Sequence, residues 1–524
     1  MGIEFREFLM SLREHGELLE ITKPVDLRDV AALVPQSDKG LLFSNVSGYR
    51  MPLVSGIFLS RNRLAMGLGV PYDKAEKKLR RAMEHPIDPA VVKEAPVKEI
   101  VLTGDQVDLY QLPVPIFSLL DGAPTITGGI VIAQDPEYGM NAGVYRLMLK
   151  ERNLTGIDIV TPNNLRRFAE RALAAGKPLP ISVSIGVHPY ELLASSFKAP
   201  LGINELTYAG GLRGEASRLA PGETIPVPSI ADAEIVLEGE ILPEGWTHPE
   251  GPFGEFNRLM GGLHYNPRVR IRAMMHRRDP IYYALHMPWE NIWLSAPVYE
   301  AAAWRVLREA GVSATAIHLT PGGCCHWHII AAIKKQPGDG KNAILALLSI
   351  ADIKHVVVTD DDIDIFDPVD VEWAIATRVQ ADRDVVIVSS ARAKPLDPSL
   401  PPSEAVPTTA KMGIDATIPE YALKERYQRI VYFNEGKVQL KDYLDPVSGK
   451  KAIGQRDLQG DLAPLAEKIL AELSNSHRFF AEILTLFPGE EFRKIARAIG
   501  WLHQKEKITQ DKEGKYQPKG LHPG

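Results

Sequence analysis

The chain has 524 residues, of which 45% are hydrophobic and 24% are charged. This length exceeds the roughly 250–300 residues at which a single hydrophobic core stops growing, so we expect several domains. Its 60 basic and 66 acidic residues are interspersed and give a net charge of −6. That charge provides no electrostatic case for a nucleic acid or an anionic membrane as the main partner. Small molecules and further copies of this chain are the expected partners.

Two features of the sequence indicate the compartment. Cys324 and Cys325 are adjacent and are the only cysteines, which excludes a disulfide framework and is typical of the reducing cytoplasm. Near the N-terminus, Phe5, Phe8 and Leu12 recur at helical spacing and predict an amphipathic helix rather than a signal peptide. Because no apolar run approaches the roughly 20 residues of a membrane span, the sequence predicts a cytoplasmic protein.

The hydrophobic pattern divides the chain into regions of mixed α/β and α+β class. Residues 1–110 alternate helical stretches with short apolar strands, which predicts an α/β region. Residues 111–305 contain β-rich runs with two helical insertions and predict a mostly antiparallel sheet or barrel. In residues 306–460, apolar runs such as "HVVV" and "DVVIV" alternate with helices and predict a parallel α/β domain. Residues 461–524 are predicted to be helical, with a polar, frayed tail over about the last 20 residues.

The stretch "THPEGPFGEF", residues 247–256, places Glu250 and Glu255 around a compact apolar turn. A carboxyl group kept in an apolar turn tends to have a raised pKa, as a general acid needs. Two carboxyl groups can also divide the roles of proton donor and ionised partner. The local spacing alone favours a plainer interpretation, in which both glutamates are surface residues at a turn.

A second candidate site is "GMNAGVYRLMLKERN", which contains Asn141 and Arg146. Arg146 lies in an apolar, strand-like run where a lone cation is costly, so it should face a carboxylate or a phosphate. Asn141 stands beside small residues that allow a ligand to approach the backbone. The alternative is that Arg146 only pairs with a structural acid.

Three further motifs are less specific. In "ASSFKAPLGINELTYAGGLRG", Ser195 and Ser196 suit a phosphate or a cation and Glu205 begins a helix, but without GxGxxG a capping role is the better interpretation. The stretch "GGCCHWHII" has zinc-ligand types without a second pair at finger spacing, so pocket or core residues are favoured. The acids of "TDDDIDIFD" are expected to cap helices or pair with cations rather than bind calcium.

Together, in their order and spacing, these motifs resemble the UbiD family of decarboxylases, which use prenylated FMN. The resemblance rests on "EGPFGE", "NAGVYR", "INELTYAGGLRG" and "DDDIDIFDPVDVEWAIATR", and extends to "KMGIDAT" at residues 411–417. It implies an N-terminal α/β region, a central split β-barrel that holds the cofactor, and a C-terminal α/β domain with a helical tail. It also implies a homodimer or a homohexamer.

The resemblance assigns roles to individual residues. It implies that Glu255 donates a proton and that Glu250 orients Arg146 near the substrate carboxylate. It implies that the cofactor phosphate is held through a divalent cation, usually Mn²⁺, with K⁺ nearby, and that Asn141, Asn164 and Glu205 are the metal ligands. Asn164 stands in "TPNNL" where the family often has a histidine, and an amide is the weaker ligand, so the metal identity stays open. The implied cofactor-binding residues are Asn141, Gly143, Val144, Tyr145, Arg146, Asn163, Ser195, Ser196, Phe197, Glu205 and Lys341.

The reaction that the family implies is the reversible, non-oxidative decarboxylation of an aromatic or heteroaromatic, α,β-unsaturated acid through a covalent adduct with prenylated FMN. No side chain can act as the electron sink that loss of CO2 requires, which is the chemical reason to expect this cofactor, supplied by a flavin prenyltransferase. The predicted substrate pocket favours an aromatic acid with a polar group and consists of His286, Trp289, His326 and Ile330.

Two other functions and one structural question stay open from the sequence. One alternative is a decarboxylase or carboxylase that acts on an aryl-CoA thioester. The other is a non-catalytic, flavin-binding subunit of a multi-subunit carboxylase, against which the retained Arg146, Glu250 and Glu255 argue. The Pro-rich residues 395–409 form either a mobile lid or an ordered surface crossing.

Overall fold

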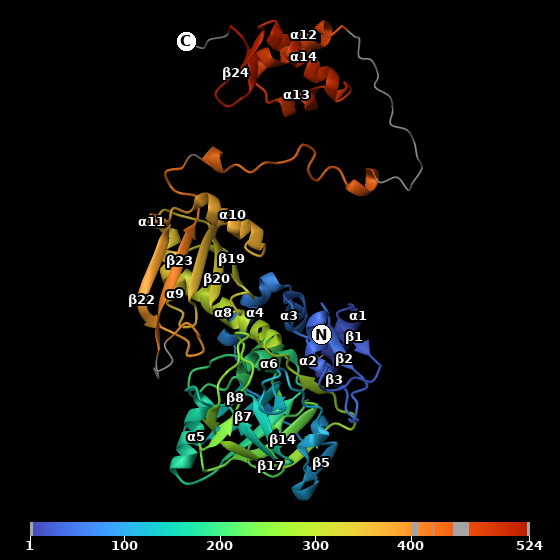
Figure 1. The fold of residues 1–524 in the computed structure, drawn as a ribbon, viewed down its shortest axis with the longest axis vertical. Coiled ribbons are helices and arrows are strands. Elements are labelled where there is room, and N and C mark those ends of the chain that lie inside the picture. Colours follow the sequence, from blue (N-terminus) through green and yellow to red (C-terminus); the bar gives the residue numbers. More distant parts are fainter. Residues whose placement is uncertain (1–3, 401–406, 423, 444–460, 521–524) are drawn as a thin grey trace. The chain divides into compact units, whose positions relative to one another are not determined.

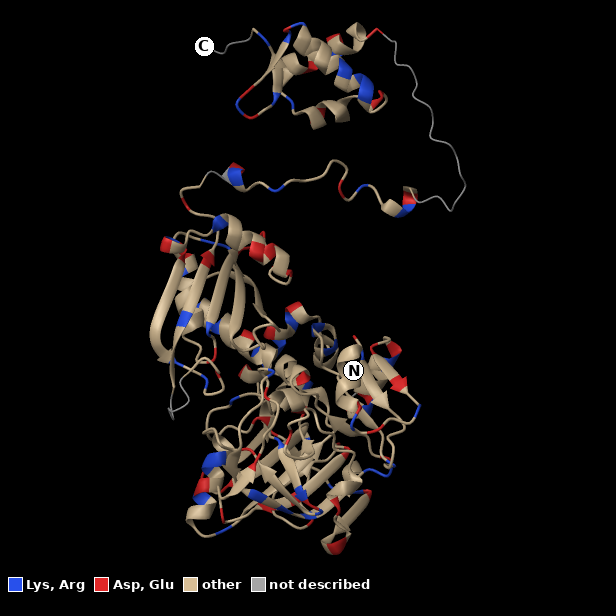
Figure 2. Cartoon of the chain, in the orientation of Figure 1, with Lys and Arg blue, Asp and Glu red and all other residues tan. Residues whose placement is uncertain are grey.

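The computed structural model describes residues 4–400, 407–422, 424–443 and 461–520 (Figure 1). The chain divides into two compact units, Met1–Ala422 and Leu423–Gly524, and each is described by itself. The predicted boundaries near residues 110 and 305 fall inside the first unit and stay predictions, and the boundary at residue 460 lies outside the described residues. Acidic and basic residues are interspersed along the ribbon (Figure 2). All described helices are too short or too polar to cross a membrane.

An α/β layer begins the first unit. Helix α1 (Phe5–Glu14) buries Phe5, Phe8, Leu9 and Leu12, which confirms the predicted amphipathic helix. A mixed four-stranded sheet lies beside it, in the order β1 (Leu18–Ile21), β2 (Gly40–Phe43), β3 (Leu53–Ser55) and β18 (Tyr282–Ala284). The other helices of this layer are α2 (Val30–Leu33), α3 (Arg61–Leu68) and α4 (Ala75–Glu84).

The centre of the first unit is a curled nine-stranded sheet whose neighbouring strands are all antiparallel, as the sequence predicts. Its strand order is β6 (Thr125–Ile126), β9 (Leu147–Glu151), β10 (Leu154–Ile157), β17 (Arg268–His276), β14 (Ile235–Ile241), β11 (Leu179–Ile185), β7 (Gly129–Asp135) and β8 (Gly139–Val144), with β5 (Ile100–Thr103) on β17. The helices within this region are α5 (Asn164–Ala174), α6 (Pro189–Ala194) and α7 (Leu206–Arg213). A small sheet joins β13 (Ser229–Ile230), β12 (Arg218–Ala220) and β4 (Ala90–Val91).

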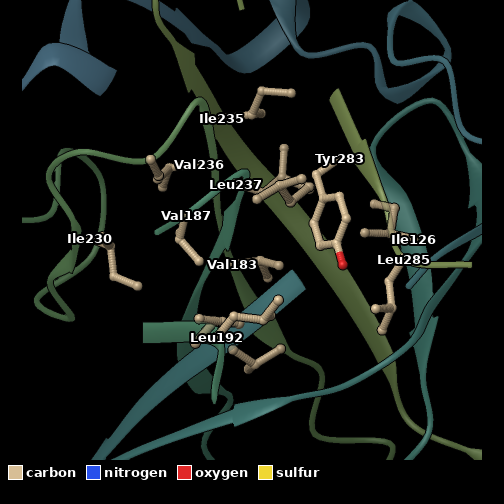
Figure 3. Close-up of a cluster of buried hydrophobic side chains, with 14 of the residues drawn as sticks. Ile126, Val183, Val187, Leu192, Ile230, Ile235, Val236, Leu237, Tyr283 and Leu285 are labelled. Carbon is tan, nitrogen blue, oxygen red and sulfur yellow. The ribbon is translucent and has the colours of Figure 1, made fainter. Parts of the chain in front are cut away.

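One hydrophobic core holds the N-terminal layer and the central sheet together. Figure 3 shows Val183 of β11 and Leu237 of β14 beside Leu192 of α6 and Tyr283 of β18. These four side chains are at most 2% exposed and belong to a single cluster of buried residues. Because Tyr283 comes from the N-terminal sheet, the two sheets share one close-packed interior and cannot shift independently without opening voids.

The last sheet of the first unit is mixed, whereas the sequence predicts a parallel one. Its order is β19 (Ala314–Leu319), β20 (His328–Ile333), β21 (His355–Asp360), β23 (Thr408–Ala416) and β22 (Val385–Arg392). Only the pairs of β21 with β20 and with β23 are parallel. The apolar run in β22 forms an antiparallel edge strand in which Ile387 is 68% exposed. The apolar composition of this run therefore did not mean that the strand is buried. The neighbouring helices are α8 (Trp289–Glu309), α9 (Asp339–Leu348), α10 (Pro368–Arg378) and α11 (Ala381–Asp384).

The second unit has its own core. Helices α12 (Ala463–Asn475), α13 (Phe480–Leu486) and α14 (Phe492–Gln504) enclose a cluster of buried aliphatic side chains. A hairpin of β24 (Ile508–Gln510) and β25 (Tyr516–Pro518) completes it, and the Tyr516 N–H donates to the Arg478 carbonyl at 2.7 Å. The prediction of a frayed tail is therefore wrong over residues 508–518. The sequence of this hairpin looks polar because Ile508 is its only fully buried hydrophobic residue.

Candidate active site

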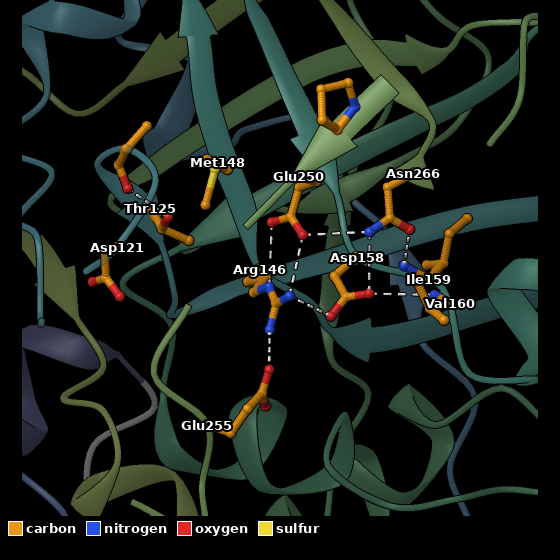
Figure 4. A network of polar contacts seen from close by, with 12 residues as sticks. Asp121, Thr125, Arg146, Met148, Asp158, Ile159, Val160, Glu250, Glu255 and Asn266 are labelled. Carbon is orange, nitrogen blue, oxygen red and sulfur yellow. Dashed lines mark hydrogen bonds and ion pairs between the residues drawn. The ribbon is translucent and has the colours of Figure 1, made fainter. Parts of the chain in front are cut away.

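Arg146 is the centre of a buried network of carboxylates (Figure 4). It lies between β8 and β9, and its guanidinium meets the carboxylates of Asp158, Glu250 and Glu255. The Nη2 atom is 2.9 Å from Asp158 Oδ2 and 3.1 Å from Glu250 Oε2, and Nη1 is 2.7 Å from Glu255 Oε1. The expectation that Arg146 faces a carboxylate thus agrees with the geometry, with three acids instead of one.

Glu250 holds the guanidinium from the buried side. It ends β15 (His248–Glu250), which pairs with β16 (His264–Asn266), and it is only 1% exposed. Asn266 donates its side-chain N–H to Glu250 at 3.3 Å. A Cβ on Gly156 would lie 3.0 Å from the Glu250 Cγ, so a larger residue would crowd this side chain. Glu250 therefore contacts Arg146 in two places, through Nε and Nη2, and fixes the plane of the guanidinium.

Glu255 occupies the opposite side of the guanidinium, on the turn that follows β15. Asp121 Oδ1 accepts the Gly254 N–H at 3.1 Å, and the Gly122 N–H donates to the Pro252 carbonyl at 2.8 Å, so this turn is anchored to residues 121–122. Burial raises the pKa of Glu255, while the adjacent Arg146 lowers it. Its carboxyl group is thus kept protonated to a higher pH than an exposed glutamate would be.

A cavity of about 820 Å³ opens beside this network. Glu255 and Arg146 line it, whereas Glu250 lies behind the guanidinium and does not. Many residues that the sequence predicts for the site also line this cavity: Asn141, Gly143, Val144, Tyr145, Asn163, Asn164, Ser195, Ser196, Phe197, Glu205 and His326. Asn141 and His326, which are more than 180 residues apart in the sequence, thus line the same cavity.

One wall of the cavity carries polar atoms with no partner. Asn141 donates its side-chain N–H to Glu205 Oε1 at 2.9 Å, and the Ala142 N–H donates to Glu205 Oε2 at 2.8 Å. The Asn141 Oδ1 and Ser195 Oγ atoms are buried and have no hydrogen-bond partner among the described residues. Burial raises the pKa of Glu205 to about 7. Orphaned buried oxygens next to a carboxylate are the donor set that a hard cation accepts, so these residues fit a metal-bound phosphate.

The two asparagines of "TPNNL" are placed differently. Asn163 is the N-cap of α5, and its Oδ1 accepts the Arg166 N–H at 2.9 Å and the Tyr145 hydroxyl at 3.3 Å. Asn164 donates its amide N–H to the Ala199 carbonyl at 3.1 Å. Within the described residues no group of three or more His, Cys, Asp or Glu is arranged to hold a metal, and the predicted set offers one carboxylate and two amides. Ligation by Asn164 stays a prediction.

Besides Glu250, four predicted residues do not line the cavity. His286 Nε2 contacts the Ala31 carbonyl at 2.9 Å, and Trp289 stacks under the Arg258 guanidinium at 5.0 Å. Ile330 packs in the small core beneath α10, because it falls on the other face of β20. Lys341 on α9 donates to the carbonyl of Arg383 at the surface. A motif in a loop or strand can indicate that the segment lies near a site, but it does not determine whether a given side chain points into the cavity or away from it.

Two other motifs have the structural roles that the sequence favours. Arg378 pairs with Asp360 at 3.1 Å and with Asp362 at 2.6 Å, so the acids of "TDDDIDIFD" serve a cation as predicted. Cys324 and Cys325 are free, buried thiols in the turn before β20. The Nδ1–H of His326 donates to the Cys324 carbonyl at 2.7 Å, and burial lowers the pKa of this imidazole, which therefore presents a neutral ring to the cavity.

Sequence reasoning missed a second charged cluster in the cavity wall. Asp352 accepts hydrogen bonds from Lys198, Tyr299 and Lys394 on the same oxygen, Oδ2. Lys394 follows β22, just before the Pro-rich segment, and Asp352 follows α9, so only the fold brings them together. The Asp158 contact to Arg146 was missed as well. The only sequence signal for the Asp352 cluster was the pair of cations, Arg392 and Lys394, among the apolar residues of "ARAKPL".

Comparison with known proteins identifies the family. The chain matches three family profiles described as the N-terminal, Rift-related and C-terminal domains of 3-octaprenyl-4-hydroxybenzoate carboxy-lyase, UbiD, over residues 9–83, 90–288 and 292–416. The chain belongs to the UbiD family of decarboxylases. The matches end at residue 416, so the second unit lies outside them.

Individual relatives resemble the chain over most of its length. Anhydromevalonate phosphate decarboxylase from Methanosarcina mazei is 35% identical over 82% of this chain and 99% of its own length. The UbiD-class enzyme HmfF from Pelotomaculum thermopropionicum, solved in complex with FMN, is 41% identical with a TM-score of 0.80, over 84% of this chain and all of its own. The 3,4-dihydroxybenzoic acid decarboxylase of Enterobacter cloacae is 28% identical with a TM-score of 0.77, over 84% and 99%.

Proposed function

We propose that this UbiD-family decarboxylase uses prenylated FMN to remove CO2 from an aromatic or heteroaromatic, α,β-unsaturated acid. One observation carries the proposal: Arg146 is clamped by buried Glu250 and meets Glu255 at 2.7 Å in the cavity wall. The FMN bound to HmfF supports the flavin, and 3,4-dihydroxybenzoic acid as the substrate of another relative supports an aromatic acid. The M. mazei relative is named for a phosphate-bearing substrate, so the substrate class has to be tested directly.

The part of the cavity lined by Asn141, Ser195 and Glu205 is proposed to hold the cofactor phosphate. Asn141 Oδ1 and Glu205 would ligate a divalent cation such as Mn²⁺, with Asn164 as a further ligand, and Ser195 Oγ would contact K⁺ or the phosphate. When bound, the prenylated flavin supplies the electron sink for the charge left when CO2 departs. Gly143, Val144 and Tyr145 also line the cavity, and a Cβ on Gly143 would lie 2.5 Å from the Tyr145 ring.

The chain's own residues position the acid and deliver a proton. Arg146 binds the substrate carboxylate, because its guanidinium lines the cavity and its orientation is fixed from behind. Glu255 donates a proton to the carbon from which CO2 has left, since burial raises the pKa of its carboxyl group. Phe253 lies under the guanidinium at 4.8 Å, and with Phe256 it keeps this part of the cavity apolar. Such exclusion of water protects a developing carbanion from other proton sources.

Further features of the proposal come from the family. The reaction is reversible, a flavin prenyltransferase supplies the cofactor, and the protein works in the cytoplasm. The protein assembles as a homodimer or a homohexamer; among the relatives, an evolved form of HmfF in complex with prFMN is dimeric, and it is 38% identical with a TM-score of 0.77 over 84% of this chain and all of its own.

The experiment that tests this proposal is production of the protein together with a flavin prenyltransferase. The absorption spectrum and the mass of the released cofactor should then identify prenylated FMN. The loaded protein should release CO2 from at least one member of a panel of aromatic, heteroaromatic and non-aromatic unsaturated acids and aryl-CoA thioesters. Loading with prenylated FMN but release of CO2 only from non-aromatic acids would overturn the substrate class, and failure to bind any flavin would overturn the proposal.

A further inference from the structure

The Asp352 cluster concentrates positive charge at one end of the cavity. Asp352 Oδ2 lies 2.9 Å from Lys198 Nζ and 3.4 Å from Lys394 Nζ, and it also accepts the Tyr299 hydroxyl. Two ammonium groups therefore share a single carboxylate oxygen. Arg392, two residues before Lys394 in the chain, also lines the cavity and adds a third cation, so these residues carry more positive than negative charge.

Lys394 is the buried member of the cluster. Its side chain is 17% exposed, whereas that of Lys198 is 76% exposed and extends into solvent. Its contact of 3.4 Å with Asp352 is longer than the roughly 2.7–2.9 Å of a charge-assisted hydrogen bond. An ammonium group has three N–H donors, and within the described residues Lys394 uses only this one. A buried cation with two unused donors is costly unless a ligand completes its contacts.

Lys394 also lies close to the proposed site of proton transfer. Its Nζ atom is 4.5 Å from the centre of the Phe256 ring, and Phe256 follows Glu255 directly in the chain. The ring of His326 also packs against Phe256, with 4.5 Å between the ring centres. The turn at Glu255 and Phe256 thus contacts two groups of charges in one cavity: Glu255 meets Arg146 in an acidic end, and the ring of Phe256 meets Lys394 in a basic end.

We propose that this basic end binds a second acidic group of the substrate, a carboxylate or a phosphate carried at the end remote from the carboxylate that leaves as CO2. This inference rests on the proposed decarboxylation. Lys394 donates its two unused N–H groups to that anion, and Asp352 holds the ammonium in place through the shared Oδ2. The substrate class is therefore a planar unsaturated diacid, or an unsaturated acid that bears a phosphate.

The test compares matched acids that differ only in the second acidic group. With prenylated-FMN-loaded protein, kcat/KM should favour the diacid, and Lys394→Met should reduce that preference by about 10- to 100-fold. Lys334→Met removes an exposed lysine and is the matched control, which should keep the preference. A wild type that prefers the monoacid, or a Lys394→Met variant that loses both acids equally, overturns the proposal.

Two further measurements keep the result interpretable. FMN fluorescence quenching measures the affinity of Lys394→Met for the flavin, and a weakening that matches the lost preference would assign the lysine to the flavin phosphate instead. Calorimetry with saturated, non-reactive acids on FMN-loaded wild type measures the preference for two acidic groups without turnover. If calorimetry shows the preference but no acid releases CO2, the proposed function fails and this inference stands.

The wild-type protein offers a test that needs no variant. Burial lowers the pKa of Lys394 to about 8, although Asp352 opposes the shift. Because only the ammonium form attracts an anion, the calorimetric preference for the diacid should fall as pH rises through about 8. A preference that stays constant well above that pH contradicts the proposal. The titratable groups that face this ammonium are Asp352, Lys198, Glu255, His326 and Cys324.

Discussion

The two ends of the cavity use the same kinds of side chain in opposite proportions. At the acidic end a single guanidinium, Arg146, is shared by three carboxylates. At the basic end a single carboxylate, Asp352, is shared by two ammonium groups and a phenol. An excess of carboxylates favours protonation of the acid that must donate, and an excess of ammonium groups favours anion binding. The contrast indicates that one end performs chemistry and the other end recognises the substrate.

The largest expected effect tests the chemical role of the acidic end. Glu255→Gln keeps the hydrogen bond to Arg146 but cannot donate an acidic proton. Turnover by the cofactor-loaded variant should fall by about 10²- to 10⁴-fold, with flavin binding retained. Glu309→Gln, at an exposed position on α8, is the control. Full activity in Glu255→Gln would show that the proton comes from another group.

Removal of the shared guanidinium should have the largest effect on stability. Arg146→Met leaves Glu250, 1% exposed, beside two other carboxylates with no cation. The free energy of unfolding should fall by about 3–5 kcal/mol, measured by urea denaturation. Arg305→Met replaces an exposed arginine and should change it by less than about 0.5 kcal/mol. Equal effects of the two substitutions would mean that the acidic end is not held by its cation.

Removal of the shared carboxylate at the basic end should lower the free energy of unfolding by a smaller amount. Asp352→Asn removes the charge that two lysines share, but Lys198 is 76% exposed and can turn into water. We expect a loss of about 1–3 kcal/mol in the same urea assay. The pKa of Lys394 should also fall further, because Asp352 now raises it. A loss as large as that of Arg146→Met would contradict the difference between the two ends, with exposed Asp382→Asn as the control.

The smallest effect concerns pH. Asp158 raises the pKa of Glu255 through its negative charge, so Asp158→Asn should lower that pKa by less than about one unit. Activity that needs the protonated acid is lost as pH rises through this pKa, and the basic limb of the kcat profile should therefore move to lower pH. A limb that moves to higher pH would exclude Glu255 as the titrating donor.

The acidic end was more accessible to sequence reasoning than the basic end. Arg146 stands in an apolar strand, where burial demands an acidic partner, and Glu250 and Glu255 flank a turn with a distinctive composition. The position of Asp158 after β10 carries no such signal. Lys394 follows β22 and Asp352 follows α9, and nothing in the sequence relates these two loops. Charge partners set by tertiary packing have no spacing rule in the sequence.

Fold prediction failed where composition is ambiguous between environments. Helix α1 and the antiparallel central sheet follow from clear periodicity, and both are as predicted. The run in β22 is as apolar as a buried strand, yet Ile387 is 68% exposed at a sheet edge. Ile330 was expected in the pocket, but a strand presents alternate residues to opposite faces, and a shift of one residue places it in the core.

The most direct test of the two-ended cavity is the division of lost activity between kcat and KM for one diacid substrate. Glu255→Gln should lose its activity mainly in kcat, because it removes an interaction made in the transition state. Lys394→Met should lose its activity mainly as a raised KM, because it removes a contact made equally in the bound substrate and the transition state. The measurement is steady-state kinetics of the two cofactor-loaded variants. A raised KM in Glu255→Gln with a lowered kcat in Lys394→Met, or a lowered kcat in both variants, would contradict the division of the cavity into two ends.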